Sequence, residues 1–320
     1  MSERLVYFNG DYIKEKDAKI SIYDSALMFG DMVFEMTRSF NKNQFLLSEH
    51  IERLFASAKY VSIPMPITKQ ELYNDCLEVV EKNIPAFKDD DEHRLMINVT
   101  RGNLSIYQKA MNSNSGTNII ISDFPLRWTV QSMGPLFESG INVVVPNQKI
   151  IPANLLEPKV KSRSRLHYMM ANLEVSRQEG SNNWALLTDP DGFIAEGTGS
   201  NFLIVKDGKL IGPEPRNILR GISLDYVIQI ANDLEIQFEQ KNIEPYDVMF
   251  CDEAFMTGTP FCLLPVTSIH SEKIGTGKMG EITKKILNEW SKRVGVQIDK
   301  QISQWYDHEL SGVTPYSVNK

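Results

Sequence analysis

The 320-residue sequence is long enough for two packed lobes, and its 42% hydrophobic and 9% aromatic content is typical of globular proteins. Disordered and fibrous classes are therefore excluded. The formal net charge of -7, with both signs mixed along the chain, provides no basic surface for nucleic acid or for an anionic membrane. We expect small-molecule chemistry or protein contacts instead.

The amino terminus and the cysteine content indicate where the protein works. MSERLVYFNG lacks a basic segment followed by an apolar stretch, and no window approaches the roughly 18 apolar residues of a membrane span. Cys76, Cys251 and Cys262 are too scattered for a disulfide framework, and the five histidines are not spaced as metal ligands. We predict a cytoplasmic protein with no membrane segment and no metal site.

The first 124 residues have the pattern of a small α+β domain. Val6 and Phe8 alternate into the turn pair Asn9-Gly10, which predicts a hairpin, and residues 33–40 have strand-like content. We expect Ser48 to cap a helix. A second helix should open with a capping box made by Thr68 and Glu71, and strands are expected at residues 95–100 and 118–122.

Proline and glycine interrupt both periodicities after this first lobe. We place an interdomain linker at residues 125–136 and a larger domain at residues 137–320. In that domain we expect a strand at 141–145, helices at 166–177, 222–232 and 278–294, and strand pairs that turn at Asp191-Gly192 and Asp207-Gly208.

Four segments of the second lobe have compositions suited to binding a charged ligand. The segment Glu157–Tyr168 contains two lysines and two arginines near a helix start, which alone indicates only a solvated basic edge. Glu196 enters a run of small residues just before a buried strand, where a carboxylate is costly unless a cation meets it. The helix start at Gly221 and the turn Thr257–Thr259 both offer N–H groups and hydroxyls to an anion.

Taken in chain order, these segments resemble the class IV, or fold-type IV, pyridoxal-phosphate enzymes. This family includes branched-chain aminotransferases, D-amino acid transaminases and aminodeoxychorismate lyases. The likeness covers nearly the whole chain, and its further segments are Tyr7–Gly10, Phe29–Glu35, Glu49–Leu54 and Ile274–Thr283.

The resemblance implies a role for each matching residue. Lys161 matches the lysine that holds pyridoxal 5'-phosphate as a Schiff base and later moves the substrate proton, and Lys159 is a competitor whose spacing fits less well. Glu196 matches the carboxylate that faces the pyridine nitrogen and keeps the ring an electron sink. Arg53 matches an arginine that binds the cofactor phosphate with its guanidinium fork.

The same resemblance assigns the phosphate and substrate contacts. Ile222, Ser223 and Thr259 match the two phosphate-binding turns of the family. Phe29 and Phe34 would provide apolar walls for an aliphatic side chain. The run Phe34–Arg38 is similar to a strand of the branched-chain enzymes, which favours transamination between an apolar L-amino acid and a 2-keto acid such as 2-oxoglutarate.

Other residues resemble other members of the family and leave the reaction open. Arg165 stands where the branched-chain enzymes carry a tyrosine near the cofactor's phenolic oxygen, and the pair Arg165-Leu166 is similar to the lyases. Val99–Gly102 resembles the D-amino acid transaminases, whose arginine helps to hold the substrate carboxylate. We hypothesise that Arg101 or Arg165 binds a substrate carboxylate, and D-amino acid transamination, a lyase reaction or amine transamination remain alternatives.

The family likeness also implies an architecture. We expect a two-domain α+β protein of the D-amino acid aminotransferase type with its active site at the domain interface. The larger lobe should contribute Lys161, Glu196 and the phosphate-binding turns. A homodimer is implied as well, with first-lobe loops of one subunit completing the pocket of the other.

Overall fold

The computed structural model describes residues 3–110 and 116–313, whose contacts group into two compact units. Unit 1 comprises Met1–Leu126 and Val160–Arg165, and unit 2 comprises Arg127–Lys159 and Leu166–Lys320. We expected Lys161 in the larger lobe, but its segment groups with unit 1 because the backbone of residues 161–163 pairs with a strand of that unit. The domain boundaries themselves stay a prediction.

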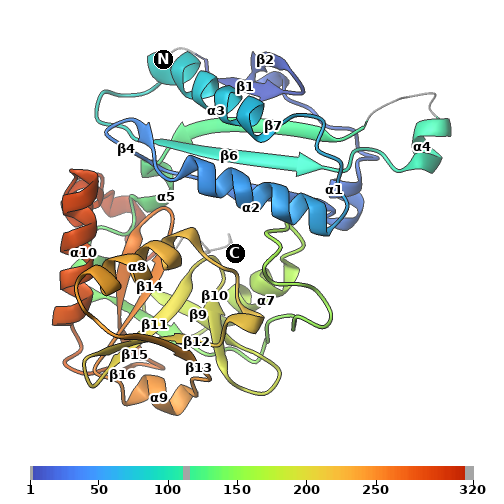
Figure 1. The fold of residues 1–320 in the computed structure, drawn as a ribbon. Helices are drawn as coiled ribbons and strands as arrows, with labels where there is room; N and C mark the ends of the chain where they lie inside the picture. The colour runs from blue at the N-terminus through green and yellow to red at the C-terminus, as the bar shows by residue number, and fades with distance from the viewer. Residues whose placement is uncertain (1–2, 111–115, 314–320) are drawn as a thin grey trace. The chain divides into compact units, whose positions relative to one another are not determined.

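Unit 1 is a five-stranded antiparallel sheet with two long helices on one face (Figure 1). The strand order is β2-β1-β7-β6-β3. The described elements are β1 (Leu5–Phe8), β2 (Asp11–Lys14), η1 (Glu15–Asp17), α1 (Ser25–Phe29), β3 (Met32–Met36), β4 (Ser39–Phe40), β5 (Asn43–Gln44), α2 (Leu47–Tyr60), α3 (Lys69–Asn83), η2 (Ile84–Ala86), β6 (His93–Thr100), α4 (Ser105–Ala110) and β7 (Asn118–Pro125).

Strand alternation gives the unit 1 sheet two different faces. Side chains of one register pack with α2 and α3 into a single core, and those of the sheet are Tyr7, Val33, Leu95, Ile97, Val99, Ile119 and Ile121. The opposite register places Phe34, Met96 and Asn98 on the second face, since Phe34 pairs with Asn98 across β3 and β6. Phe34, a candidate substrate-binding residue, therefore lies on this second face.

Local sequence signals for unit 1 are confirmed in most places and wrong at one helix start. The hairpin turns at Asn9-Gly10, where both residues have positive φ, and Thr68 and Glu71 form the expected capping box. The prediction that Ser48 caps α2 is wrong. Leu46 precedes the helix in a left-handed conformation with φ of 52°, so the helix begins at Leu47 without a side-chain cap. Residues 33–40 form two strands, because β3 ends at Met36 and β4 begins at Ser39.

Unit 2 is built on a nine-stranded sheet flanked by helices (Figure 1). Its described elements are α5 (Arg127–Val130), α6 (Leu136–Ser139), β8 (Ile141–Val144), α7 (Leu166–Val175), β9 (Asn183–Thr188), β10 (Ile194–Gly197), β11 (Asn201–Lys206), β12 (Lys209–Pro213), η3 (Pro215–Asn217), α8 (Ile222–Asp233), β13 (Phe238–Lys241), α9 (Pro245–Met249), β14 (Glu253–Gly258), β15 (Cys262–Ile269), β16 (Glu272–Lys273), α10 (Glu281–Val294), α11 (Ile298–Gln304) and η4 (His308–Leu310).

The sheet of unit 2 closes on itself. Its order is β10-β9-β8-β15-β14-β11-β12-β13, and an additional pairing joins β10 to β11. The closing contact is the antiparallel pair Glu196 and Asn201. The ring therefore closes at Glu196, the carboxylate that the sequence analysis selected.

The buried interior of unit 2 explains why the sequences of its strands are continuous apolar runs. The fully buried aromatic side chains include Trp184, Phe202, Phe255 and Phe261. Helix α8 buries Leu224, Val227, Ile230 and Ala231, which recur at helical spacing. The predicted turns at Gly192 and Gly208 are confirmed, since both glycines have positive φ at the ends of strand pairs. None of the helices in the described part of the chain is long and apolar enough to cross a membrane.

Gly140 joins α6 to β8 at a point where no side chain fits. Its φ is 71°, and a Cβ there would lie 2.2 Å from Thr267 Cγ2. We expect Gly140→Ala to lower the free energy of unfolding by about 1–3 kcal/mol more than Gly192→Ala, because Gly192 also has positive φ but has nothing within 4 Å. Urea denaturation of both variants measures the difference. Equal losses would contradict the proposed steric conflict.

Candidate active site

The segment that contains Lys161 runs antiparallel to β3. Phe34 N donates to Lys161 O at 3.0 Å, and Arg163 N donates to Met32 O at 3.1 Å. Between these bonds Val33 and Ser162 form an isolated antiparallel bridge. Because side chains alternate along this paired stretch, Lys161 and Arg163 point to the same side.

Phe34 is the surface on which those three cations converge. Lys161 Nζ lies 5.2 Å from the centroid of the Phe34 ring, and Arg163 Cζ and Arg165 Cζ lie 3.6 and 5.6 Å from it. The Lys161 amide also donates to Ser57 Oγ at 3.2 Å, which ties the segment to α2. A buried ring beneath three cations makes this part of unit 1 attractive to anions.

Arg53 is held by the fully buried carboxylate of Glu35. Its Nε and Nη2 donate to the two Glu35 oxygens at 2.6 and 2.9 Å, and His50 Nδ1 lies 2.7 Å from Glu35 Oε2. Burial alone would raise the pKa of Glu35, but Arg53 and His50 hold it well below its ordinary value. Burial lowers the pKa of His50 despite Glu35. The bidentate pair fixes the orientation of the Arg53 guanidinium.

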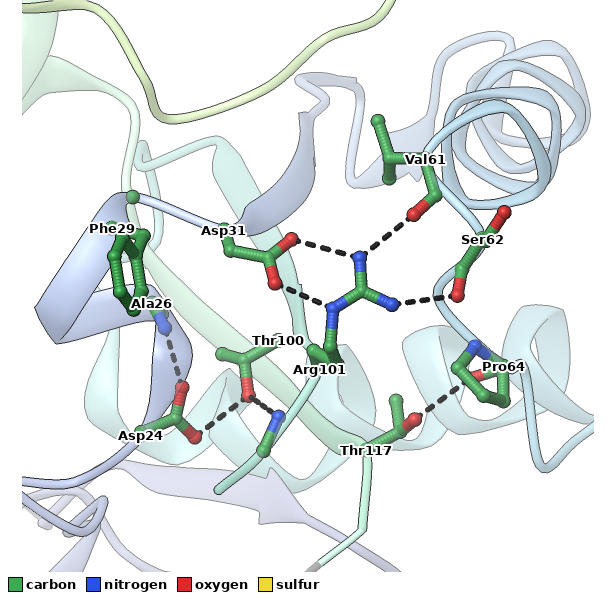
Figure 2. Close-up of polar contacts among 12 residues, drawn as sticks. Asp24, Ala26, Phe29, Asp31, Val61, Ser62, Pro64, Thr100, Arg101 and Thr117 are labelled. Carbon is green, nitrogen blue, oxygen red and sulfur yellow. Dashed lines mark hydrogen bonds and ion pairs between the residues drawn. The ribbon is translucent and has the colours of Figure 1, made fainter. Parts of the chain in front are cut away.

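Arg101 is held by a carboxylate and two backbone carbonyls (Figure 2). Its Nε and Nη2 donate to Asp31 at 2.5 and 3.1 Å, and its guanidinium also donates to the carbonyls of Val61 and Ser62, each at 2.7 Å. Arg101 thus ties the residues after α1 to the end of α2. The prediction that it binds a substrate carboxylate stays a prediction, and such a role would require Asp31 to share these donors.

The neighbouring α1 is fixed by Asp24, which caps it (Figure 2). Asp24 accepts from Ala26 N at 2.8 Å, and its other oxygen accepts from Thr100 Oγ1 at 2.8 Å. The helix ends at Gly30, whose φ is 67°. Phe29, which precedes Gly30, is 65% exposed. Phe29 and Phe34 therefore differ in environment, since Phe34 is buried.

In unit 2, Glu196 is a buried carboxylate that three donors surround. Oε1 accepts from the Tyr168 hydroxyl at 2.8 Å, and Oε2 accepts from Asn201 Nδ2 and Leu219 N, both at 3.1 Å. Tyr168 lies on α7, whereas Asn201 begins β11. These hydrogen bonds compensate the cost of burying the carboxylate and fix its orientation.

Asn201 connects three of the segments that the sequence analysis selected in unit 2, namely Glu196, the start of α8 and the turn that carries Thr259. Besides Glu196, its Nδ2 donates to Leu219 O at 2.9 Å, and it pairs with Thr257 across β11 and β14. A Cβ on Gly221 would lie 2.0 Å from Asn201 Oδ1, so glycine permits this approach. The contacts of Asn201 therefore hold three parts of unit 2 together: Glu196, the start of α8 and the turn that carries Thr259.

The start of α8 presents backbone donors rather than a capping side chain. Gly221 is the N-cap and has no side chain to bond Ile222, Ser223 or the next residue. The Ser223 side chain is buried, and Ile222 and Thr259 are half-buried. An uncapped N-terminus of a helix of this length is suited to bind a phosphate.

The competing lysine, Lys159, is already paired. Its Nζ donates to Glu157 Oε1 at 2.8 Å and to Arg216 O at 3.3 Å. Its side chain is therefore engaged in an ion pair, while Lys161 lies over Phe34. This arrangement favours Lys161 as the reactive amine.

Four residues of these clusters were not selected from the sequence: Asp31, Arg163, Tyr168 and Asn201. Arg163 and Tyr168 lie within the basic segment, and alternation from Lys161 could have indicated Arg163. No local signal indicates the pairing of Asp31 with Arg101, because 70 positions separate the two residues.

Comparison with known proteins identifies the family of this chain. Residues 32–269 match the model of the amino-transferase class IV family. The chain belongs to the class IV aminotransferases. A Methanocaldococcus jannaschii protein provisionally named a branched-chain-amino-acid aminotransferase is 35% identical over 89% of this chain and 94% of its own length. The branched-chain-amino-acid aminotransferase of Escherichia coli K12 is 29% identical over 88% and 90%.

Solved structures of related aminotransferases share the fold of this one. The T.th. branched-chain amino acid aminotransferase, solved with pyridoxamine 5'-phosphate, has a TM-score of 0.81 and 26% identity, covering 92% of this chain and 95% of that one. The Thermoproteus uzoniensis branched-chain aminotransferase, solved with norvaline, has a TM-score of 0.81 and 26% identity, covering 95% and 98%. The predicted two-domain α+β fold of type IV is confirmed.

The buried Glu35 makes the stability of this aminotransferase sensitive to acid. Its folded-state pKa is lower than its ordinary value of 4.5, so the stabilisation is present at neutral pH and is lost as the pH falls through and below 4.5. We expect Glu35→Gln to lower the free energy of unfolding by about 3–5 kcal/mol at pH 7, because Arg53 loses its buried partner. The difference in the free energy of unfolding between this variant and the wild type should decrease toward pH 3.5. Urea titrations across this range measure it.

Glu52→Gln is the matched control for that prediction. Glu52 lies on the same helix but is exposed, where it pairs with Lys69. A surface pair contributes about 0–1 kcal/mol, so the control should follow the wild type at every pH. A gap between Glu35→Gln and wild type that stays constant down to pH 3.5 would contradict the assignment.

Proposed function

We propose that this aminotransferase transfers the amino group between a branched-chain or other apolar L-amino acid and a 2-keto acid such as 2-oxoglutarate. The observation that carries the proposal is the buried Phe34 ring beside Lys161, which gives the reactive amine an apolar neighbour. The branched-chain names of the relatives support the same substrate class.

Pyridoxal 5'-phosphate is the cofactor of this family, and the residues of the chain fit it. The uncapped start of α8 at Ile222 and Ser223, together with Thr259, suits a phosphate, and Arg53 can add a guanidinium. Glu196, already oriented by three donors, suits a protonated ring nitrogen. When bound, the cofactor supplies an electron-withdrawing ring that stabilises negative charge on the substrate Cα.

Lys161 is the catalytic residue in this proposal. Its amine would hold the cofactor covalently and, once displaced by substrate, would take the proton from the substrate Cα and deliver it to the C4' carbon of the cofactor. The bond from its carbonyl to Phe34 N and the bond from its amide to Ser57 hold the backbone in place. The Lys161 backbone is therefore fixed when its side chain transfers the proton.

Arg165 is the better candidate for binding the substrate α-carboxylate. It lies on the same side of its segment as Lys161, four residues away and above the same ring. The Arg101 guanidinium instead donates to Asp31 and to two carbonyls. Phe34 and, from α1, Phe29 would then contact the aliphatic side chain of the substrate.

D-amino acid transamination is the second candidate. A Bacillus licheniformis D-alanine aminotransferase is 29% identical over 88% of this chain and 94% of its own length, which favours it. The segment that resembles these enzymes carries Arg101, and the ion pair with Asp31 makes that arginine a less available carboxylate ligand. A lyase reaction and amine transamination are the two further candidates that the family offers.

A homodimer is part of the proposal. Residues 22–29 expose several apolar side chains, with Ile22 70%, Leu27 63% and Phe29 65% exposed. Apolar side chains gathered in this way are typical of surfaces that another protein covers. Light scattering should report twice the 36.5 kDa mass of the chain, and a monomer with full activity would contradict the dimer.

We also propose that the enzyme works in the cytoplasm. Cys76, Cys251 and Cys262 are buried and unbridged. Free thiols are usual in the reducing cytoplasm, whereas exported proteins tend to use disulfides.

Replacing Lys161 is the direct test of the proposed chemistry. We expect Lys161→Ala to lose transamination of L-leucine with 2-oxoglutarate by at least about 10³-fold in kcat, because both the covalent link and the proton transfer disappear. Borohydride reduction followed by peptide mass analysis should locate the cofactor on position 161 in wild type and find none in the variant. The control is Lys159→Ala, which should keep activity.

A donor panel separates the candidate reactions. L-leucine, D-alanine and aminodeoxychorismate are each incubated with the wild-type enzyme, and keto acid and pyruvate are measured. Faster reaction with L-leucine supports the proposal, whereas a preference for D-alanine, or pyruvate release from aminodeoxychorismate, would replace it with the corresponding candidate.

A further inference from the structure

The Tyr168 hydroxyl is one of three neutral donors that hydrogen-bond the buried carboxylate of Glu196. It donates to Oε1 at 2.8 Å, whereas Asn201 Nδ2 and Leu219 N each donate to Oε2 at 3.1 Å. Glu196 is only 5% exposed, so these donors replace water around it. Because hydrogen bonds are directional, donors on both oxygens restrict the rotation of the carboxylate.

Helix α7 carries Tyr168 and is attached to its surroundings at further points. Asn172, one helical turn after Tyr168, accepts from Thr198 Oγ1 at 3.0 Å. Residues four apart share a face of a helix, so Tyr168 and Asn172 contact the same short stretch of chain. Toward the end of α7, Glu174 accepts from Asn147 N and Nδ2, both at 2.8 Å. The Tyr168 hydroxyl is therefore presented by a fixed helix.

The other two donors to Glu196 also hold the backbone together, which makes them poor probes of the carboxylate. Asn201 Nδ2 donates to Leu219 O at 2.9 Å as well, and Leu219 N is itself a backbone group. The Tyr168 ring packs against the ring of His167, with the centroids 4.1 Å apart. Phenylalanine at position 168 keeps the ring and removes the hydroxyl alone.

We propose that Tyr168 is a positioning residue that holds the Glu196 carboxylate in the orientation that meets the ring nitrogen of pyridoxal 5'-phosphate. The inference rests on the role proposed for Glu196 and extends it to a residue of another element. A carboxylate that rotates freely would have to be ordered when the cofactor binds, and that ordering weakens binding. Donors that are in place beforehand remove this cost.

A positioning role has a signature that a purely structural role lacks. If Tyr168 acts through Glu196, removing its hydroxyl affects only ligands that carry the ring nitrogen. A residue that merely supported the shape of the site would affect every ligand of that shape. The effect should also disappear once the carboxylate at position 196 is replaced, because two residues that act through one contact are not additive.

Binding of pyridoxamine 5'-phosphate and of its 1-deaza analogue to the cofactor-free full-length enzyme tests the inference. The analogue carries C–H in place of the ring nitrogen, and neither ligand forms a covalent bond with a lysine. For Tyr168→Phe we expect the Kd of pyridoxamine 5'-phosphate, measured by fluorescence titration, to rise about three- to tenfold, the factor for one hydrogen bond. The Kd of the analogue should change less than about twofold, which also shows that the variant is folded.

Two further comparisons control for the loss of a hydroxyl and for the route of the effect. Tyr246→Phe removes the hydroxyl of a tyrosine that is 68% exposed on α9, and it should bind both ligands as the wild type does. Glu196→Gln keeps the size of the side chain and removes the carboxylate. Adding Tyr168→Phe to Glu196→Gln should raise the Kd of pyridoxamine 5'-phosphate by less than about a further twofold.

The outcomes separate this inference from the proposed function. An unchanged Kd of pyridoxamine 5'-phosphate in Tyr168→Phe, an equal rise for both ligands, or an undiminished effect in the Glu196→Gln background would overturn the role of Tyr168 and leave transamination intact. A wild-type enzyme that binds both ligands equally well would overturn the role proposed for Glu196, and the inference with it. Ligand binding as expected without transamination of L-leucine would overturn the proposed substrate and support the role of Tyr168.

Discussion

The short backbone ladder between residues 161–163 and β3 is the constraint on which the chemistry of unit 1 depends. Two hydrogen bonds, Phe34 N to Lys161 O and Arg163 N to Met32 O, fix the register of an otherwise irregular segment. A shift of one residue would turn Lys161 and Arg163 away from Phe34 together, because neighbouring side chains alternate. Backbone register, rather than side-chain packing, therefore determines which cations can act as a group.

Unit 2 buries a carboxylate, that of Glu196, and orients it by hydrogen bonds. Glu196 lies at the pair that closes the ring of strands, where Asn201 faces it. Asn201 bonds both the carboxylate and the backbone before α8, so one side chain connects the carboxylate to the helix start. A closed sheet resists the distortion that would separate them, since closure leaves neither strand as a free edge at this point.

Much of the fold could be predicted from local patterns, whereas the environment of the site residues could not. The Asn9-Gly10 turn and the Thr68–Glu71 capping box depend on a few adjacent residues, so the sequence predicts both directly. The start of α2 is predicted wrongly because Leu46 adopts a left-handed conformation that no nearby residue type indicates. Identifying Lys161 and Glu196 needs family resemblance, since local composition alone suggests only a basic edge and a costly acid.

Arg101 and Arg163 show why the role of a single residue is harder to infer from a matching motif than the fold is. Arg101 and Arg163 are both guanidiniums of unit 1, and sequence likeness draws attention only to Arg101. Asp31, distant in the sequence, neutralises Arg101 and makes it an anchor between α1 and α2. Arg163 meets only neutral groups, so its charge remains uncompensated by the described protein. The partner that folding brings to a side chain, rather than the motif around it, decides whether its charge stabilises structure or binds a ligand.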